Sequence, residues 1–196
     1  KLGAFVSKWF YERPGLGVLK PGREASDFLA TVPGFGAAVC AWIDVPHEKG
    51  AEERHGTSRR RFAEAQRTAQ AVEHLLRDLP ESMSLGVITF YAAQRDAIFE
   101  ALTRIGVAER TEQGLRVVPK YASTPTGEER LPIGTVDAFQ GKEFDVVLLS
   151  TVRSNRQPVA LPDDPTEADA AFERQASGRY GHLRSANRLN VAMSRQ

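Results

Sequence analysis

Several kinds of site are excluded by what these 196 residues lack. Cys40 is the single cysteine, so an intrachain disulfide and a cysteine-based zinc site are impossible, and a reducing intracellular setting is favoured. No apolar run approaches the ~20 residues needed to cross a bilayer, and no secretory signal opens the chain. We therefore expect an intracellular protein, cytoplasmic or nuclear, without a membrane partner. The histidines are too scattered to suggest a metal site, and we expect none: His47, His55, His74 and His182.

Complete catalytic signatures are missing as well. A G-x-x-x-x-G-K-[ST] phosphate loop is absent, because Gly141-Lys142 is followed by Glu143 and the earlier glycine position holds Val136. There is no G-x-S-x-G nucleophile elbow either. The chain therefore does not contain a self-sufficient catalytic centre of these kinds.

The charge is balanced overall but unevenly distributed. With 26 Lys and Arg against 25 Asp and Glu, the formal net charge is +1. Residues 163–173 contain five acidic side chains and no basic one, whereas residues 174–196 contain five arginines and no acidic one. Basic stretches of this kind can contact phosphates, although most charge runs are simply solvated surfaces.

The order of apolar segments predicts an α/β domain with a mainly parallel sheet. Alternating or continuous apolar stretches indicate strands, three- and four-residue spacing indicates helices, and the long Pro-, Asp- and Gly-rich stretch 154–181 indicates an inserted loop. The expected strands are 37–45, 85–91, 133–137 and 144–152, with a short one at 115–118; the expected helices are 62–79, the stretch before Gly106, and 187–194.

Polar residues follow the predicted strands at the positions where ligands gather in parallel sheets. They include Gln94, the stretch 140–143, and Ser154 with Asn155. Ordinary helix caps and turns are the alternative interpretation of any one such cluster.

Three stretches resemble helicase motifs. Residues 134–148 (GTVDAFQGKEFDVVL) resemble motif V of superfamily 1 helicases, and residues 188–195 (RLNVAMSR) resemble motif VI. Residues 86–95 match motif IV, with Phe90 where proline is usual, and residues 5–12 resemble the helix after the family's Gln-Tyr-Arg segment. Together they resemble the second RecA-like domain of the branch typified by the nonsense-mediated-decay RNA helicase and senataxin.

This resemblance implies a RecA-like three-layer αβα domain over residues 1–196, of the P-loop NTPase superfamily but without its own phosphate loop. It implies the C-terminal motor domain of an ATP-dependent RNA or DNA helicase or translocase, an ATP hydrolase. The implied partners are single-stranded RNA or DNA and the first RecA-like domain of the parent chain. ATP and Mg²⁺ are the implied cofactors, with the metal ligands on that first domain. We expect a fragment of a longer protein, inactive alone.

The resemblance also assigns roles to residues. Arg195 is the implied arginine finger, since a guanidinium is always charged and binds phosphate oxygens bidentately. Gly141 and Glu143 are implied nucleotide contacts, and Gln140 can couple the nucleotide to the nucleic acid. The candidate nucleic-acid contacts are small polar residues at strand ends: Thr89, Gln94, Thr135, Ser154 and Asn155.

Two matters stay open at the level of sequence. Arg61 stands where the family often has the asparagine of Asn-x-x-Glu-Ala, which puts a carried-over role there in doubt. Residues 154–181 are compatible with a lid over a nucleic-acid groove or with a solvated loop. The alternative function is a degenerate RecA-like module that binds nucleic acid or protein without motor activity.

Overall fold

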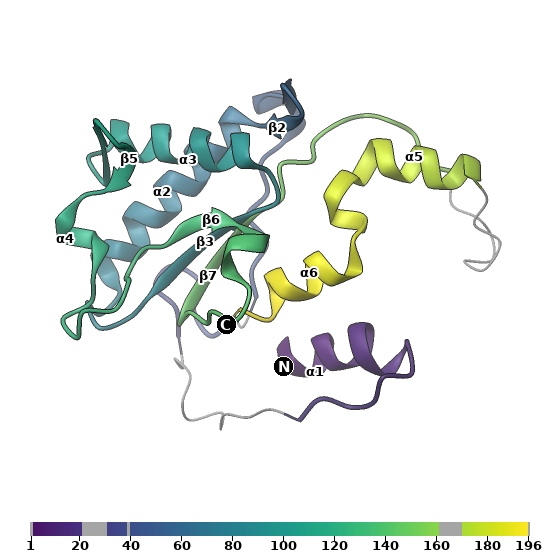
Figure 1. Cartoon of the computed structure of the whole chain (residues 1–196), viewed down its shortest axis with the longest axis horizontal. Helices are drawn as coiled ribbons and strands as arrows, with labels where there is room; N and C mark the ends of the chain where they lie inside the picture. The colour runs from purple at the N-terminus through teal and green to yellow at the C-terminus, as the bar shows by residue number, and fades with distance from the viewer. Residues whose placement is uncertain (1, 21–30, 39, 161–169, 196) are drawn as a thin grey trace.

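Three parallel strands form the centre of the molecule (Figure 1). The structure is a computed structural model that describes residues 2–20, 31–38, 40–160 and 170–195. Strands β3 (Leu85–Thr89), β6 (Ile133–Thr135) and β7 (Val146–Ser150) lie in the order β6-β3-β7, with both pairs parallel. Thr89 lies level with Thr135 and Ser150, so the carboxyl ends of all three strands meet at one edge. The predicted α/β class with a parallel sheet is confirmed.

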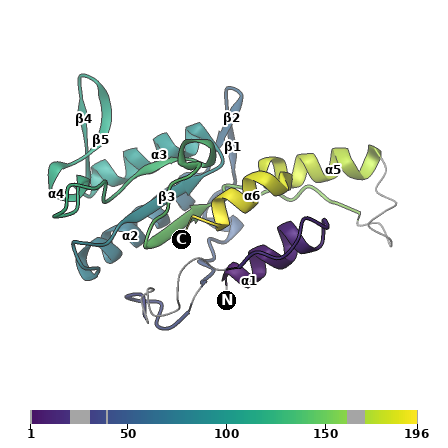
Figure 2. The same cartoon turned by 60° about the horizontal axis from the view of Figure 1, so that its bottom comes forward.

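Both faces of this sheet are covered, which gives three layers (Figures 1 and 2). Leu85 and Val87 of β3 belong to the core cluster formed with helices α2 (Phe62–Asp78) and α3 (Ala92–Arg104). Ile88 belongs to the second cluster, beside the 3₁₀ helix η4 (Val136–Phe139) and α6 (Ala186–Met193). This alternation follows from the two-residue period of a strand, whose successive side chains point to opposite faces.

The remaining elements lie around this core. Helix α1 (Leu2–Ser7) and the π-helix η1 (Lys8–Glu12) lie beside α6. The side-chain amide of Asn190, on α6, donates to the Tyr11 hydroxyl of η1 at 3.1 Å. The short elements are η3 (His47–Lys49), α4 (Pro119–Ala122), η6 (Gly181–Arg184) and the antiparallel hairpins β1 (Glu53–His55) with β2 (Ser58–Arg60) and β4 (Ala108–Thr111) with β5 (Gly114–Val117).

Most predicted helices and central strands are present within a few residues of their expected bounds. The expected helices at 62–79, before Gly106 and at 187–194 correspond to α2, α3 and α6. The short strand expected at 115–118 is β5, and its partner β4 was not predicted. The spacing of apolar residues therefore identified the elements that bury one face.

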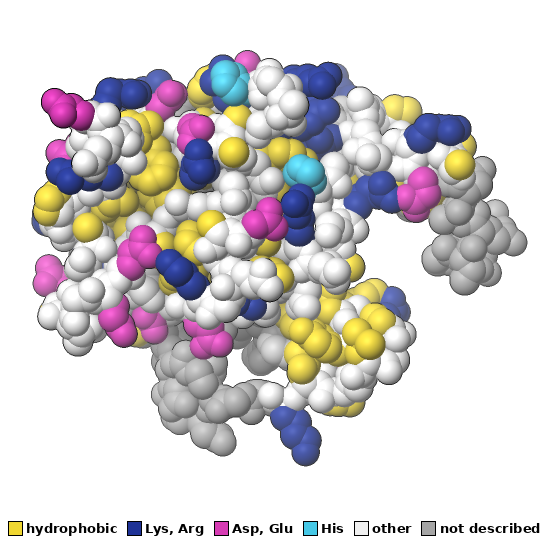
Figure 3. All heavy atoms as spheres, in the orientation of Figure 1, with side chains coloured by type: hydrophobic (Ala, Val, Ile, Leu, Met, Phe, Trp, Pro, Cys, Tyr) yellow, Lys and Arg dark blue, Asp and Glu magenta, His cyan; other side chains and the backbone are white. Residues whose placement is uncertain are grey.

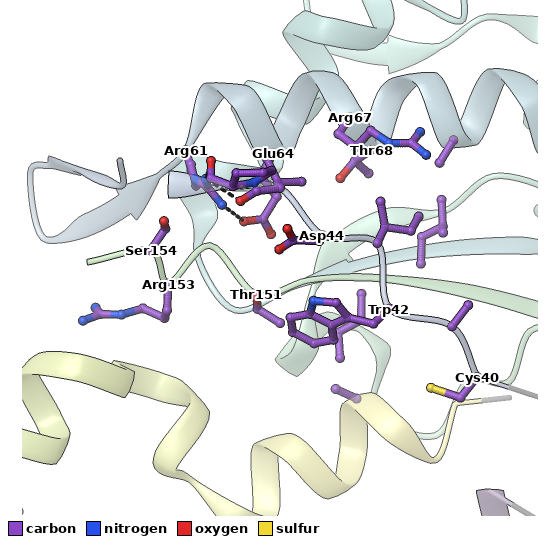
Figure 4. Close-up of a pocket in the computed structure, with 18 of the residues that line it drawn as sticks. Cys40, Trp42, Asp44, Arg61, Glu64, Arg67, Thr68, Thr151, Arg153 and Ser154 are labelled. Carbon is purple, nitrogen blue, oxygen red and sulfur yellow. Dashed lines mark hydrogen bonds and ion pairs between the residues drawn. The ribbon is translucent and has the colours of Figure 1, made fainter. Parts of the chain in front are cut away.

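The predicted strand at 37–45 is wrong for its described residues. Residues 40–46 form no regular secondary structure and pair with no strand among the described residues, and Trp42 is 80 % exposed. Figure 4 shows this segment running alongside β7, and a cavity of about 1090 Å³ lies between the two. The segment is held instead by Arg61, which donates to the Val45 and Pro46 carbonyl oxygens, both at 2.7 Å. An apolar run is a strand only where a neighbour lies within hydrogen-bonding distance.

The insertion at 154–181 also differs from the loop that was expected. Its last part is helix α5 (Ala170–Tyr180), whose Ala176 is buried. Residues 161–169 of the insertion, including much of the acidic run, lie outside the described residues. The helix has a weak apolar stripe, which explains why periodicity did not reveal it.

A search of the described part of the chain for membrane-spanning helices found no helix long and apolar enough.

Replacing Gly86 by alanine is expected to destabilise the fold by about 1–3 kcal/mol, because the new methyl group would overpack the core. A Cβ atom at this position would lie 2.8 Å from the Cγ and Cε2 atoms of buried Phe144. Gly3→Ala is the matched control, since a Cβ there meets nothing within 4 Å on helix α1. Urea unfolding measures both free energies, and equal effects of the two substitutions would contradict the packing argument.

Candidate nucleotide and nucleic-acid site

Arg195 lies beside the loop formed by residues Gln140–Glu143, as expected for two parts of one site. Its Nη1 atom donates to the carbonyl oxygens of Phe139 at 3.4 Å and Lys142 at 3.2 Å. The backbone N–H of Phe144 in turn donates to the Arg195 carbonyl oxygen at 2.8 Å. The guanidinium is therefore held against the loop by the backbone rather than by a carboxylate.

The loop itself is open to a ligand. Gln140, Gly141 and Glu143 are exposed, and Gly141 has φ +83° with nothing within 4 Å of a Cβ position. A left-handed residue here favours glycine. Lys142 pairs with Glu129 at 3.2 Å, so it does not neutralise Glu143. Within the described residues no carboxylate pairs with Arg195, and the site can therefore accept an anion.

Helix α6 carries a second arginine at its other end. The Arg188 backbone N–H is capped by the Ser185 hydroxyl at 3.4 Å, which starts the helix. The Arg188 guanidinium reaches Asp137 at 3.2 Å and the Nδ1 atom of His182 at 2.9 Å. Asp137 belongs to η4, so α6 and η4 contact each other at both ends, through Arg188 at one and Arg195 at the other.

Gln94, a predicted nucleic-acid contact, lies inside the protein. Its Oε1 atom accepts the Arg61 backbone N–H at 2.7 Å, and its Nε2 atom donates to the Ser150 hydroxyl at 3.0 Å. Ser150 donates to Glu64 at 2.7 Å, and the same carboxylate oxygen accepts the Val152 N–H at 2.9 Å. In this conformation Gln94 joins the starts of α2 and α3 to the end of β7.

Thr89 is also fully buried, and its hydroxyl oxygen has no hydrogen-bond partner among the described residues. Thr135 is half-buried and lines a pocket of about 330 Å³ at the ends of β3 and β6. Of these two predicted contacts, only Thr135 faces an open site in this conformation.

Ser154 and Asn155 lie together, and Glu52 binds both. The Ser154 backbone N–H donates to Glu52 Oε2 at 2.7 Å, and the Asn155 amide donates to the same atom at 3.2 Å. Arg153 pairs with the other oxygen of Glu52 at 3.3 Å, and both side chains are 5 % exposed. Sequence reasoning missed Glu52, because a glutamate in a polar loop carries no distinguishing signal.

Arg61 is the second residue whose role the sequence did not reveal. Besides Val45 and Pro46, it donates to the Gly50 carbonyl oxygen at 2.7 Å and lies 3.7 Å from Glu64. Figure 4 shows Arg61 and Glu64 at the start of α2, with Asp44 beside Glu64 and Thr151 below them in the view. The only indication in the sequence was that arginine replaces the family's asparagine at this position. In the structure this arginine holds the segment before α2 through its backbone carbonyl oxygens.

Basic side chains gather on two parts of the surface. Figure 3 shows Lys and Arg side chains gathering over β2 and along α5, and hydrophobic side chains over α1. No group of three or more His, Cys, Asp or Glu that could hold a metal ion occurs in the described ranges.

The three-layer sheet, with its ligand-accessible loop after β6 and arginines at both ends of α6, defines a RecA-like domain. The AAA domain family profile matches residues 1–196, and the chain belongs to that family.

Known relatives agree. The chain is 28% identical over 195 residues to the ATP-dependent helicase NAM7 of Saccharomyces cerevisiae, which covers 99% of this chain and 16% of NAM7. It is 30% identical over 188 residues to the ATP-dependent helicase upf1 of Schizosaccharomyces pombe, covering 90% and 18%. It is 27% identical over 181 residues to the regulator of nonsense transcripts 1 homolog of Neurospora crassa, and the match covers 90% of this chain and 15% of that relative. The resemblance to superfamily 1 helicases is thereby confirmed, and the chain spans less than a fifth of these relatives.

His182 gives the site a pH-dependent contribution to stability. Partial burial lowers the pKa of His182 below 6.5, Arg188 and Arg153 lower it further, and Asp137 opposes them. As the pH falls, the His182 imidazole therefore takes up a proton at a higher pH in the unfolded chain than in the folded one. The free energy of unfolding decreases as the pH falls from about 7 through the pKa of His182 in the folded protein. Urea unfolding between pH 7.5 and 5 is expected to show a shallower loss for His182→Gln than for the wild type. His74→Gln is the control and keeps the contribution of His182; parallel profiles for the wild type and His182→Gln would contradict the prediction.

Proposed function

We propose that this chain is the second motor domain of an ATP-dependent superfamily 1 helicase or translocase that acts on single-stranded RNA or DNA. It would supply the arginine finger and part of the nucleic-acid groove, while a first RecA-like domain holds most of the nucleotide. Domain closure on ATP and reopening after hydrolysis would move the pair along the strand.

One observation carries this proposal. Arg195 has no carboxylate partner among the described residues and lies beside the exposed Gly141 and Glu143. A cation without a counter-ion, beside a loop that a ligand backbone can approach, suits a phosphate oxygen. Among the described residues Glu143 has no hydrogen-bond or ion-pair partner, so its exposed carboxylate oxygens can accept hydrogen bonds from ribose hydroxyls.

This chain would line one side of the bound nucleotide, and the first RecA-like domain would line the other. Arg195, Gly141 and Glu143 would contact ATP, and the bound nucleotide supplies the phosphoryl group that is transferred to water. We place the Mg²⁺ ligands on the first domain. Arg195 would stabilise the negative charge that develops on the phosphate oxygens.

The nucleic acid would lie along the carboxyl ends of the strands. Thr135 faces this edge directly, and Ser154 with Asn155 lies at the end of β7. Gln94 would act from the interior by holding the end of β7 through Ser150, and Thr89 lies buried at the end of β3. The η4 helix supports coupling between the two sites, because Asp137 lies at its start and Gln140 directly follows it.

In the protein that contains both RecA-like domains, Arg195→Ala is expected to reduce ATP turnover by about 10³–10⁵-fold. The loss follows from removing the cation at the transferring phosphate. Nucleic-acid affinity is expected to stay nearly unchanged. Steady-state phosphate release and fluorescence anisotropy measure the two properties.

Arg116→Ala is the matched control, since Arg116 pairs with Glu109 on the β4–β5 hairpin, outside the site. Wild-type turnover in Arg195→Ala would remove Arg195 from the mechanism, whereas absence of turnover in the unsubstituted two-domain protein would favour a binding module without motor activity.

The purified 196-residue chain is expected not to hydrolyse ATP by itself, because it has no phosphate loop. A phosphate-release assay with and without single-stranded nucleic acid tests this. Turnover that disappears in Arg195→Ala would show that the chain needs no second domain and would contradict the proposal.

A further inference from the structure

Hydrogen bonds join the junction of α5 and η6 to the residues that follow β7. Arg153 donates to the carbonyl oxygens of Gly178 and Arg179, the latter at 3.1 Å, and Arg179 donates to the Asn155 carbonyl oxygen. The Asn155 amide donates back to the Arg179 carbonyl oxygen at 3.1 Å. These charge-assisted bonds fix part of the insertion against the sheet edge.

Gly181 makes the close approach possible. It has φ +54°, and a Cβ atom there would collide with the Tyr91 hydroxyl and lie 2.9 Å from Arg153 Nη1. The next residue, His182, donates its backbone N–H to the Tyr91 hydroxyl at 3.2 Å. Glycine at this position therefore brings the backbone of the insertion into contact with Tyr91, the residue that precedes helix α3.

This contact presents the His182 ring to the site. The ring centroids of His182 and Tyr91 lie 4.9 Å apart with planes tilted by 37°. Tyr91 is buried whereas His182 is exposed, so the imidazole has one supported side and one side open to solvent. Its Nδ1 atom is fixed by Arg188 at 2.9 Å.

The ring borders the pocket of about 330 Å³ at the ends of β3 and β6. The polar groups of this pocket have mixed character: hydroxyls, a carboxylate and a guanidinium. They come from Thr57, Ser58, Thr135, Asp137 and Arg188. A carboxylate repels a phosphate but accepts hydrogen bonds from base amino groups, so the set suits a nucleobase.

We propose that His182, which directly follows the insertion, is a nucleic-acid contact: its imidazole would stack on one base of a single strand, with the edge of that base in the pocket. The inference rests on the proposed function and adds a residue outside the helicase motifs. Aromatic rings stack on bases of any identity, so this contact adds affinity without reading sequence.

A neutral ring suits this role. The groups facing His182 are Arg188 from α6, Arg153 after β7, Asp137 from η4 and the Tyr91 ring. Together with partial burial, the two arginines outweigh Asp137 and lower the pKa of His182, which keeps the ring uncharged at neutral pH. Stacking rather than charge would then provide the contact.

Fluorescence anisotropy of the 196-residue chain with 5′-labelled 12-mers of oligo(U) and oligo(dT), at pH 7.5, tests this. His182→Ala is expected to weaken binding about 5-fold or more, and His182→Phe, which retains a flat ring, is expected to bind within about 2-fold of the wild type. The slope of affinity against salt is expected to stay unchanged in both, since no phosphate contact is lost. His74→Ala, on α2, is the matched control and is expected to bind as the wild type.

A second variant separates the ring from its placement. Gly181→Ala keeps His182 but pushes the junction of α5 and η6 off Tyr91 and is expected to lose a similar part of the affinity, with circular dichroism verifying the fold. Wild-type affinity in His182→Ala, or a smaller salt slope, would overturn the inference and leave the proposed function standing. Failure of the wild-type chain to bind either strand would contradict both.

Discussion

The parallel register of β6, β3 and β7 is the constraint on which the rest of the structure depends. It brings Thr135, Thr89 and Ser150 level, so everything that follows these strands emerges at one edge. In parallel sheets that are covered on both faces, ligands gather at this carboxyl edge. A register slip of one residue would turn Ile88 from the α6 side to the α2 side and disperse the site.

In the proposed function, helix α6 connects the nucleotide site and the nucleic-acid site at this edge. Arg188 near its start contacts Asp137, and Arg195 beyond its end contacts the Phe139 and Lys142 carbonyls. Both contacts involve η4 or the loop that directly follows it, so a shift of η4 would be felt at both ends of α6. The short, packed η4 thus gives a physical route by which a nucleotide at one end could bias nucleic-acid contacts at the other.

The sequence predicted the parts of the fold that depend on local periodicity, such as α2, β3 and α6, because an apolar stripe directly reflects burial. It also predicted that Arg195 and Gly141 belong together. It did not predict that residues 40–46 stay unpaired, since strand pairing depends on a neighbour that no local pattern encodes. The roles of Glu52 and Arg61 were likewise not predicted, because the groups that they bind lie 102 residues away for Glu52 and 11–16 residues away for Arg61.

The buried polar network explains why several candidate contacts cannot act alone. Ser154 and Asn155 already bind Glu52, so a nucleic acid must replace those bonds or use the loop as a whole. The preceding Val152 has φ +71°, a strained state for a β-branched residue that costs on the order of 1–3 kcal/mol. Its N–H donates to the half-buried Glu64 at 2.9 Å, which helps to offset that cost. The backbone strain at Val152 therefore lies between the end of β7 and Arg153, which contacts the insertion. A rearrangement of the loop after β7 would relieve this strain.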